Sequence, residues 1–279
     1  MTPLSVREAL AEARTASVET LDAHLLLAMC LGRSRSWLIA HGEALLTPAH
    51  SDRFRSWLTR RAAGEPLAYL FGEKEFHGLV LQVDARVLVP RPDTETLVDW
   101  ALELLAAQAA VPPAGAAPRV IDLGTGSGAI ALALKHAWPG ADVTALDASG
   151  GALEVARANA AALRLDVRLV SGNWWSAVRG ERFDIAVSNP PYIALHDPHL
   201  AVLTHEPAIA LTAGIDGLDA LRQIIDHAAA HLRPGGWLLL EHGHDQGPAV
   251  QGLLFQSGFA RVETRCDLAG HWRCTGAQV

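Results

Sequence analysis

Apolar residues in the first 64 positions recur with the three- and four-residue spacing of helices that bury one face. Phe54, Trp57 and Leu58 share one such stripe, in a segment that begins at Thr47-Pro48 and ends at Gly64. Thr can cap the first N–H groups of a helix, Pro suits its first turn, and Gly can adopt the left-handed conformation that ends it. The pattern predicts a small helical bundle, with helices over Val6–Ala13, Val18–Leu31, Ser34–His41 and between Thr47 and Gly64.

The helical spacing of apolar residues ends at about residue 66, and short apolar runs separated by glycines follow. Three runs, separated by turn residues such as Gly72 and Gly78, predict strands that form a β-hairpin connector. A helix then starts at Pro90-Arg91-Pro92-Asp93, and a Pro-, Ala- and Gly-rich loop follows it at residues 109–118. The predicted strands are Leu67–Phe71, Leu79–Val83 and Val87–Val89, and the apolar face of the helix is Leu97, Val98, Ala101, Leu104 and Leu105.

Strand-like and helix-like segments alternate from residue 119 onward. This alternation favours an α/β fold with a mostly parallel sheet and helices on both of its faces. The predicted strands are Val120–Leu123, Asp142–Leu146, Val167–Val170, Phe183–Ser188, Trp237–Glu241, Arg261–Cys266 and Trp272–Thr275. The predicted helices are Ala129–Trp138, Ala152–Leu163, Leu218–Leu232 and Gln246–Ser257.

Composition indicates a folded chain of about two domains. The 279 residues are 50% hydrophobic and 19% charged, so the chain can bury enough apolar surface to offset the entropy of folding. The formal net charge of −7 lies entirely in residues 76–279, because residues 1–75 carry nine basic and nine acidic side chains. A protein that holds nucleic acid mainly through phosphates needs a basic surface, so this charge disfavours DNA as a partner.

The sequence gives no sign of export or of a membrane. Residues Met1–Glu8 lack the basic and apolar regions of a secretory signal. The apolar run Leu25–Leu31 is shorter than the roughly 20 residues that span a bilayer. The chain has three cysteines, an odd number, and no Cys-x-x-Cys pair, which indicates free thiols. They are Cys30, Cys266 and Cys274. We therefore expect a cytoplasmic protein.

The first chemical signal is a glycine-rich loop, Asp122-Leu123-Gly124-Thr125-Gly126-Ser127-Gly128, between a predicted strand and a predicted helix. Glycines there allow positive φ and close approach of a ligand, and open α/β sheets bind ligands at this edge. Asp147 ends the next strand, where a carboxylate can accept both hydroxyls of a ribose. Dinucleotide folds prefer Gly-x-Gly-x-x-Gly, whereas this spacing resembles that of S-adenosylmethionine-dependent methyltransferases, whose ligand has no phosphate.

The second signal is the loop Ser188-Asn189-Pro190-Pro191-Tyr192 after the fourth strand of this part. Its two prolines fix two φ angles and remove two N–H donors, so the loop is stiff. The side-chain oxygen of Asn189 and the carbonyl oxygen of Pro190 can accept the two hydrogens of a planar amide or aromatic amine. This binding orients the poorly nucleophilic nitrogen toward an electrophilic methyl group. Tyr192 can stack on the planar group, and no metal or strong base is required.

With both motifs present, the chain resembles the protein-(glutamine-N5) methyltransferases that modify class-1 peptide-chain release factors, over nearly its whole length. Residues 66–98 are similar to that family's connector, and Pro90-Arg91-Pro92-Asp93-Thr94-Glu95 is the most selective part. Related enzymes that act on a ribosomal protein begin with the same Val-Pro-Arg but do not continue with Pro-Asp-Thr-Glu. Glu206-Pro207 and Leu239-Leu240-Glu241-His242-Gly243 also match the release-factor group.

The resemblance implies a Rossmann-like domain with a seven-stranded, mostly parallel sheet, S-adenosylmethionine as cofactor, and methylation of the glutamine in a Gly-Gly-Gln loop. In that family, an acidic residue usually precedes the Trp that corresponds to Trp174. This chain has Asn173 at that position, and the side-chain oxygen of Asn173 can also accept a hydrogen bond. The family's donor contacts correspond to Gly124, Thr125, Gly126, Ser127, Gly128, Asp147, Trp174 and Asn189. Its substrate contacts correspond to Asn189, Pro190, Pro191 and Tyr192, and the catalytic roles fall to Asn189, Pro190 and Tyr192.

We expect three parts along the chain. These are a helical substrate-docking domain at residues 1–75, a β-hairpin connector at 76–92 and a methyltransferase domain at 93–279. By the resemblance, the partner is a class-1 release factor, which the N-terminal bundle helps to grip. The expected enzyme is a monomer that binds neither DNA nor a membrane.

Other functions remain open at this point. The same Asn-Pro-Pro-Tyr loop could methylate another protein glutamine, such as one in a ribosomal protein, or an exocyclic amine of a nucleic acid. A NAD-dependent oxidoreductase could use a similar sheet, and a non-catalytic module could bind translation factors. Arg91 and Glu95 could border the donor or the glutamine entrance, or serve the structure alone. No metal is expected, because the candidate ligands do not have the sequence spacing of a zinc site. These candidates are His242, His244, Cys266, His271 and Cys274.

Overall fold

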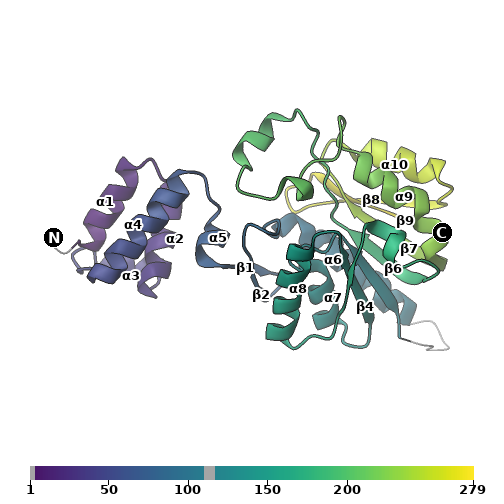
Figure 1. Cartoon of the computed structure of the whole chain (residues 1–279), viewed down its shortest axis with the longest axis horizontal. Coiled ribbons are helices and arrows are strands. Elements are labelled where there is room, and N and C mark those ends of the chain that lie inside the picture. The colour runs from purple at the N-terminus through teal and green to yellow at the C-terminus, as the bar shows by residue number, and fades with distance from the viewer. Residues whose placement is uncertain (1–3, 110–116) are drawn as a thin grey trace. The chain divides into compact units, whose positions relative to one another are not determined.

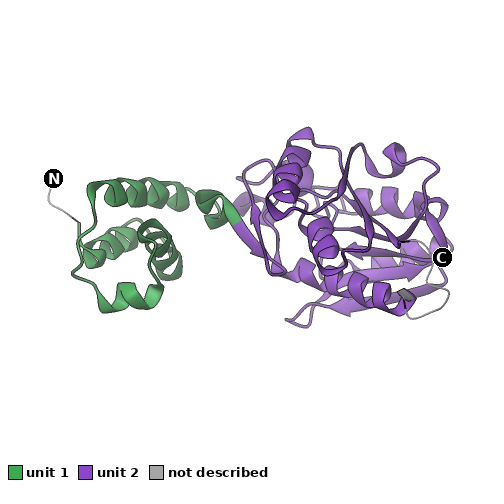
Figure 2. Cartoon of the chain, turned by 90° about the horizontal axis from the view of Figure 1, so that it is seen from below, with its two compact units in different colours: residues 1–73 green, residues 74–279 purple. Residues whose placement is uncertain are grey.

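The structure is a computed structural model that describes residues 4–109 and 117–279. The chain divides into two compact units, Met1–Glu73 and Lys74–Val279 (Figure 1, Figure 2). The domain limits expected at residues 75 and 92 stay predictions, and most of the loop predicted at 109–118 lies outside the described residues. In the described ranges, no helix is long and apolar enough to cross a membrane.

Unit 1 contains the helical bundle that the sequence predicts. Its helices are α1 (Val6–Thr15), α2 (Thr20–Leu31), α3 (Arg35–Ala40), α4 (Pro48–Ala62) and α5 (Leu67–Phe71). A capping box starts α1, since the Ser5 hydroxyl oxygen accepts from the Glu8 N–H while the Glu8 carboxylate accepts from the Ser5 N–H. Thr47 caps α4 by accepting from the N–H of His50 at 3.2 Å, as predicted. Phe54 is fully buried in the core of this unit.

The strand predicted at Leu67–Phe71 is wrong, because this segment forms α5. A run of five apolar residues is too short for its period to separate a helix from a strand. Its flanks carry the better signal: Pro66 precedes the helix, and Gly72 ends it in the left-handed conformation with φ of 76°. Tyr69 and Leu70 are buried, so the run is apolar because the helix packs into unit 1.

A β-hairpin follows, as predicted, although one of its strands is not marked by the apolar pattern. Strand β1 (Glu73–Phe76) pairs with β2 (Leu79–Gln82). The two residues between them, His77 and Gly78, both have positive φ, 49° and 77°. Two-residue turns with positive φ match the twist of the flanking strands, and the positive φ angles favour glycine. Three of the four residues of β1 are charged, which hides it from a search for apolar runs.

The strand predicted at Val87–Val89 is also wrong, because these residues belong to no helix or strand. The N–H of Val89 donates to the Glu206 carboxylate at 3.1 Å instead of to a neighbouring strand. Val87 and Val89 are both buried. The segment is therefore apolar because it is covered by the fold, and a carboxylate takes the place of a strand partner.

Unit 2 is built on a sheet of seven strands in the order β5-β4-β3-β6-β7-β9-β8. These strands are β3 (Arg119–Leu123), β4 (Asp142–Asp147), β5 (Arg168–Ser171), β6 (Phe183–Ser188), β7 (Leu232–Glu241), β8 (Arg261–Cys266) and β9 (Trp272–Gln278). The first five in the sheet order pair in parallel, and β9 runs antiparallel to both β7 and β8. The predicted seven-stranded, mostly parallel sheet is confirmed.

Helices cover both faces of this sheet (Figure 1). They are α6 (Glu95–Ala109), α7 (Ala129–Ala137), α8 (Gly150–Leu163), α9 (Asp219–His231) and α10 (Gly247–Gln256), with 3₁₀ helices η1 (Pro92–Thr94), η2 (Trp174–Ala177), η3 (Pro198–Val202) and η4 (Ala208–Ala210). In β7, Trp237 and Leu239 pack with α6 and α7, while Leu238 and Leu240 pack with α9 and α10. The strand is apolar throughout this stretch because both of its faces are covered.

Trp100 joins α6 to the sheet. Its side chain is fully buried, and its ring lies 6.1 Å from the ring of Trp237, measured between centroids. The guanidinium of Arg265 lies 4.4 Å from the Trp100 ring centroid, within reach of a cation–π interaction. A Cβ at Gly276 would lie 2.6 Å from the same ring, so β9 approaches α6 at a distance that only glycine allows.

We expect Trp100→Ala to lower the free energy of unfolding by about 3–5 kcal/mol, because the lost ring leaves a cavity between α6 and the sheet. Urea denaturation followed by circular dichroism measures this change. Phe255→Ala is the matched control, since Phe255 is 58% exposed on α10. The control should change stability by at most about 0.5 kcal/mol. Equal losses in the two variants would contradict the role of Trp100.

Candidate active site

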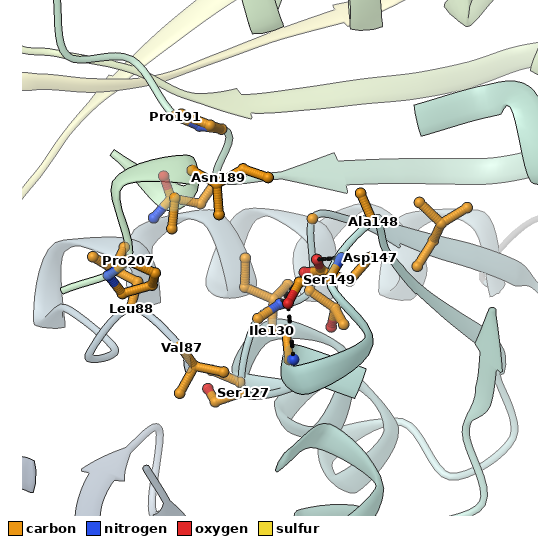
Figure 3. A pocket seen from close by; sticks show the side chains of 18 of the residues that line it. Val87, Leu88, Ser127, Ile130, Asp147, Ala148, Ser149, Asn189, Pro191 and Pro207 are labelled. Atoms are coloured by element: carbon orange, nitrogen blue, oxygen red, sulfur yellow. Dashed lines mark hydrogen bonds between the residues drawn. The ribbon is translucent and has the colours of Figure 1, made fainter. Parts of the chain in front are cut away.

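A pocket opens in unit 2 at the carboxyl ends of β3, β4, β5 and β6, four neighbouring strands whose following loops line it. Open α/β sheets bind ligands at this edge. Figure 3 shows Asp147, Ala148 and Ser149 on one side of the pocket and Asn189 with Pro207 on the other. The predicted site residues among its lining are Gly124, Thr125, Gly126, Ser127, Asp147, Trp174, Asn189 and Pro191.

Three predicted site residues lie in the same loops but outside the pocket lining. Gly128 takes the left-handed conformation, with φ of 86°, at the start of α7. Pro190 is buried, and Tyr192 is half-buried. The tertiary structure therefore brings the glycine loop and the Asn-Pro-Pro-Tyr loop to one pocket, and these three residues lie next to lining residues of the two loops.

The glycine loop folds back against β4. The N–H groups of Gly124 and Thr125 both donate to the carbonyl of Leu146, at 2.8 and 2.9 Å. Gly124 and Gly126 have φ angles of 76° and 56°, which residues other than glycine rarely adopt. A Cβ at Gly124 would lie 3.3 Å from the ring of Trp174, so a larger residue would narrow the pocket.

Asp122 is a fully buried carboxyl that fixes the glycine loop. Its Oδ2 accepts from the Thr125 hydroxyl at 2.6 Å and from the N–H of Ala131 in α7 at 3.2 Å. Its Oδ1 has no hydrogen-bond partner in the part of the chain that the structure describes. Burial raises the pKa of Asp122 to about 7. One carboxyl group that titrates near neutral pH thus joins β3, the loop and α7.

Asp147 holds two backbone segments that line the pocket (Figure 3). Its Oδ2 accepts from the N–H of Gly126 and its Oδ1 from the N–H of Ser149, both at 2.8 Å. Burial raises the pKa of this carboxyl, and the backbone donors oppose that rise. Each carboxylate oxygen can accept more than one hydrogen bond, so Asp147 retains capacity for the hydroxyls of a ligand.

Trp174 borders the pocket in a strained conformation. Its φ is 44°, which is unusual for a bulky residue, and such strain gathers at functional sites. Its indole N–H donates to the side-chain oxygen of Gln223 on α9 at 3.1 Å. Asn173 is exposed and lines the pocket beside it. Sequence reasoning missed Gln223, because no local motif links a residue of α9 to the loop after β5.

Asn189 is held at the pocket by a hydroxyl at the end of η1. Its Nδ2 donates to the Thr94 Oγ1 at 3.1 Å, and Thr94 is buried and also lines the pocket. The preceding Ser188 donates its hydroxyl to the carbonyl of Leu123 at 2.6 Å, which ties the end of β6 to the end of β3. The side-chain oxygen of Asn189 remains an acceptor.

The segment before α6 supplies pocket residues that the site prediction left out. Arg91 lines the pocket and pairs with Glu206, whose carboxylate also accepts from the N–H of Val89. Glu95 lies outside the lining and accepts from the N–H of His77 at 3.1 Å, in the hairpin. The motif Pro90–Glu95 identifies this segment as similar to the family, but its residue types do not by themselves indicate a binding role. Further lining residues of this segment are Arg86, Val87, Leu88, Pro90 and Thr94.

The structure does not group the histidines and cysteines that the sequence offered as metal ligands into a metal site within the described ranges. The buried His242 lies between the Thr275 hydroxyl, 2.7 Å from Nε2, and the Gly243 carbonyl, 2.8 Å from Nδ1. Cys266 is exposed and Cys274 is buried, both as free thiols. Within the described ranges, no three His, Cys, Asp or Glu side chains are grouped closely enough to hold a metal ion.

Known proteins resemble both units of the chain. Residues 5–72 match the family model described as the PrmC N-terminal domain, and residues 94–266 match the Methyltransferase small domain. The release factor glutamine methyltransferase of Xylella fastidiosa (strain Temecula1) is 48% identical over 270 residues, which are 96% of each chain. That of Bordetella pertussis (strain Tohama I) is 48% identical over 262 residues, which are 93% of this chain and 94% of the relative.

Solved structures share the fold with less sequence identity. The T. thermophilus 16S rRNA N2 G1207 methyltransferase, in complex with AdoMet and guanosine, has a TM-score of 0.54 at 22% identity, over 74% of this chain and 49% of its own. The hMettl16 catalytic domain, in complex with the MAT2A 3′UTR hairpin 6, has a TM-score of 0.58 at 15% identity, over 84% of each chain. At these identities the likeness shows the fold alone.

We expect Asp122→Asn to change how stability depends on pH. The pKa of Asp122 rises on folding, so the folded state binds the proton more tightly and the wild-type free energy of unfolding falls as pH rises from about 4 to about 7. The variant lacks this contribution. Its stability relative to wild type should therefore improve over that range, by an amount on the order of a few kcal/mol, and level off above it.

Urea denaturation of both proteins at pH 5, 6, 7 and 8 measures the difference. Glu241, whose pKa is also raised to about 7, is present in both proteins and cancels. The asparagine oxygen can still accept from Thr125 and Ala131, so any offset from its buried amide is independent of pH. A difference that stays constant over the series would contradict the assigned titration.

Proposed function

The chain belongs to the family of release factor glutamine methyltransferases, and we propose how its pocket performs that reaction. The enzyme transfers a methyl group from S-adenosylmethionine to the side-chain amide nitrogen of a glutamine in a peptide-chain release factor. We assign that glutamine to the Gly-Gly-Gln motif of class-1 release factors. The observation that carries this function is identity of 48% over 96% of the chain with a relative of that name.

The residues around the glycine loop fit a nucleoside that bears no phosphate. Gly124 and Gly126 present backbone without side chains, and the Asp147 carboxylate has lone pairs free for ribose hydroxyls. The ring of Trp174 offers an apolar wall for the adenine, and Asn173 lies beside it. When bound, S-adenosylmethionine supplies a methyl group activated by its positively charged sulfur.

The residues after β6 act on the acceptor. An amide nitrogen is a poor nucleophile because its lone pair is delocalised into the carbonyl group. The Asn189 side-chain oxygen and the Pro190 carbonyl oxygen accept its two hydrogens, which orients the nitrogen and stabilises the positive charge that develops on it. Tyr192 stacks against the planar amide. The rigidity of two consecutive prolines keeps these acceptors in place before the substrate arrives.

The partner and the setting follow from the family. We assign residues 1–75 to docking of the release factor and the remainder to binding of the donor and the glutamine. The enzyme acts as a monomer in the cytoplasm, where the free thiols of its cysteines are stable.

A nucleic-acid amine methyltransferase is the alternative, because the same Asn-Pro-Pro-Tyr loop could bind an exocyclic amine of a base. The net charge of −7 opposes this alternative, since a protein that holds nucleic acid mainly through phosphates needs basic side chains in excess. Incubation with labelled donor, release factor and DNA or RNA in one mixture separates the two functions. Label in the release factor, located to one glutamine by mass spectrometry, is the expected result, and label in nucleic acid alone would overturn it.

We expect Asn189→Ala to lower kcat by roughly a hundredfold or more, because an acceptor that stabilises the developing charge is lost. Binding of S-adenosylmethionine, measured by isothermal titration calorimetry, should change far less. Mass spectrometry of the Gly-Gly-Gln peptide over time gives the rate.

Asp147→Ala is the matched control, because it should weaken donor binding through lost hydrogen bonds near the ribose. Circular dichroism of both variants checks that they remain folded. Methyl transfer at the wild-type rate by Asn189→Ala would refute the proposed acceptor site, and so would equal loss of donor affinity in the two variants.

A further inference from the structure

Two adjacent tryptophans attach the loop after β5 to helix α9. Trp174 and Trp175 begin η2, and each donates its indole N–H to a residue of α9. Trp175 donates to the backbone carbonyl of Ile224 at 2.8 Å. Trp174 donates to the side-chain oxygen of Gln223 at 3.1 Å. A loop that borders the pocket is therefore held by a helix from a later part of the chain.

The two tryptophans differ in what surrounds them. Trp175 is buried, and its ring stacks on that of His231 with 4.9 Å between the ring centroids. Packing and a hydrogen bond to the backbone thus fix Trp175. Trp174 is only half-buried, because it lines the pocket and also a second hollow, formed by residues of η2 and α9 that include Gln223. Apolar packing therefore covers only part of the Trp174 ring.

The backbone of Trp174 adds a second demand. Its φ of 44° lies in the left-handed region, which a bulky residue rarely adopts. Such a conformation costs free energy, so contacts from the surrounding structure must hold the residue in it. The hydrogen bond to Gln223 is a contact of this kind. An indole N–H can only donate, so the amide of Gln223 must present its oxygen to the ring.

The position of this ring decides the shape of the pocket. A Cβ at Gly124 would lie 3.3 Å from the Trp174 ring, so the ring stands directly against the glycine loop. The proposed function assigns the ring to the adenine of the donor. A ring that left this position would change the space in which the adenine lies.

We propose that Gln223 is a positioning residue, which fixes the Trp174 ring as the wall for the adenine and thereby sets the affinity for S-adenosylmethionine. This proposal rests on the proposed function, because that function places the adenine against Trp174. Gln223 is not one of the described residues that line the pocket. It therefore acts on the donor through the tryptophan and not by a contact of its own.

Removal of the Gln223 oxygen should weaken donor binding and leave turnover unchanged. In Gln223→Leu the indole N–H of Trp174 loses its acceptor. We expect the dissociation constant of S-adenosylmethionine to rise about three- to tenfold, the range for one hydrogen bond between neutral groups. S-adenosylhomocysteine, which carries the same adenine, should lose affinity by a similar factor. The kcat at saturating donor should stay within about twofold, because the acceptor loop after β6 is unchanged.

Gln223→Glu is the conservative variant, because a carboxylate can also accept from the indole N–H. S-adenosylhomocysteine is the ligand for this comparison, since it lacks the positively charged sulfur that a new negative charge would attract. Its dissociation constant should stay within about twofold of the wild-type value.

A double-mutant cycle tests whether Gln223 acts through the indole N–H. Trp174→Phe keeps an aromatic ring at the pocket but has no N–H to donate. In that background, Gln223→Leu should change the dissociation constant by less than about twofold, against three- to tenfold in the wild type. An effect of Gln223 on the structure of α9 alone would be equally large in both backgrounds.

The decisive experiment measures the dissociation constants of both ligands by isothermal titration calorimetry for the wild type, the three single variants and the double variant. Mass spectrometry of the modified glutamine gives kcat and the KM for S-adenosylmethionine. Gln256→Leu is the matched control, since it makes the same substitution at an exposed position of α10. It should keep donor affinity within about twofold, and circular dichroism checks that every variant is folded.

Weaker donor binding in Gln223→Leu, recovery in Gln223→Glu and loss of the effect in the Trp174→Phe background support the proposal. An unchanged dissociation constant in Gln223→Leu would overturn it. An equal effect in the two backgrounds, or a loss in Gln223→Glu as large as that in Gln223→Leu, would do the same. Failure of the wild type to bind S-adenosylmethionine or to methylate a release factor would instead refute the proposed function, so the two failures are distinguishable.

Discussion

The parallel pairing of β3 with β4 on one side and β6 on the other determines where the functional loops lie. Strands that pair in parallel end at the same edge of a sheet, so the segments that follow them meet there. Gly124, Asp147 and Asn189 are far apart in the chain, yet they follow or end these three adjacent strands. The donor pocket and the acceptor loop are consequences of that one arrangement of strands.

Buried polar groups then convert the shared edge into a defined site. Asp122 links the glycine loop to α7, and Ser188 links the ends of β6 and β3. The buried Asn159 of α8 donates to the carbonyls of Gln82 and Ser127, at 3.0 and 2.9 Å, which ties the hairpin to the glycine loop. Hydrogen bonds of this kind are directional, so they fix loop geometry where apolar packing alone would leave several arrangements of similar energy.

Two carboxyl groups, Asp122 and Glu241, stand out because each has one oxygen without a partner in the described ranges. Each lies behind a loop of the site, Asp122 behind the glycine loop and Glu241 behind the Asn-Pro-Pro-Tyr loop. Burial raises the pKa of both to about 7. Each accepts a hydrogen bond from a hydroxyl group of the loop in front of it, Asp122 from Thr125 and Glu241 from Tyr192, and so connects that loop to the interior of the fold.

The sequence by itself determined the order of strands and helices from residue 119 onward, the cap of α4, and the two loops that meet at the pocket, because periodicity, Pro, Gly and capping residues act locally. It misassigned Leu67–Phe71 and Val87–Val89, where a short apolar run is buried without being a strand. Only the tertiary structure decided that Thr94 holds Asn189, that Gln223 holds Trp174 and that Arg91 pairs with Glu206. These pairs join residues from different elements, and their geometry exists only after the sheet and its helices have packed.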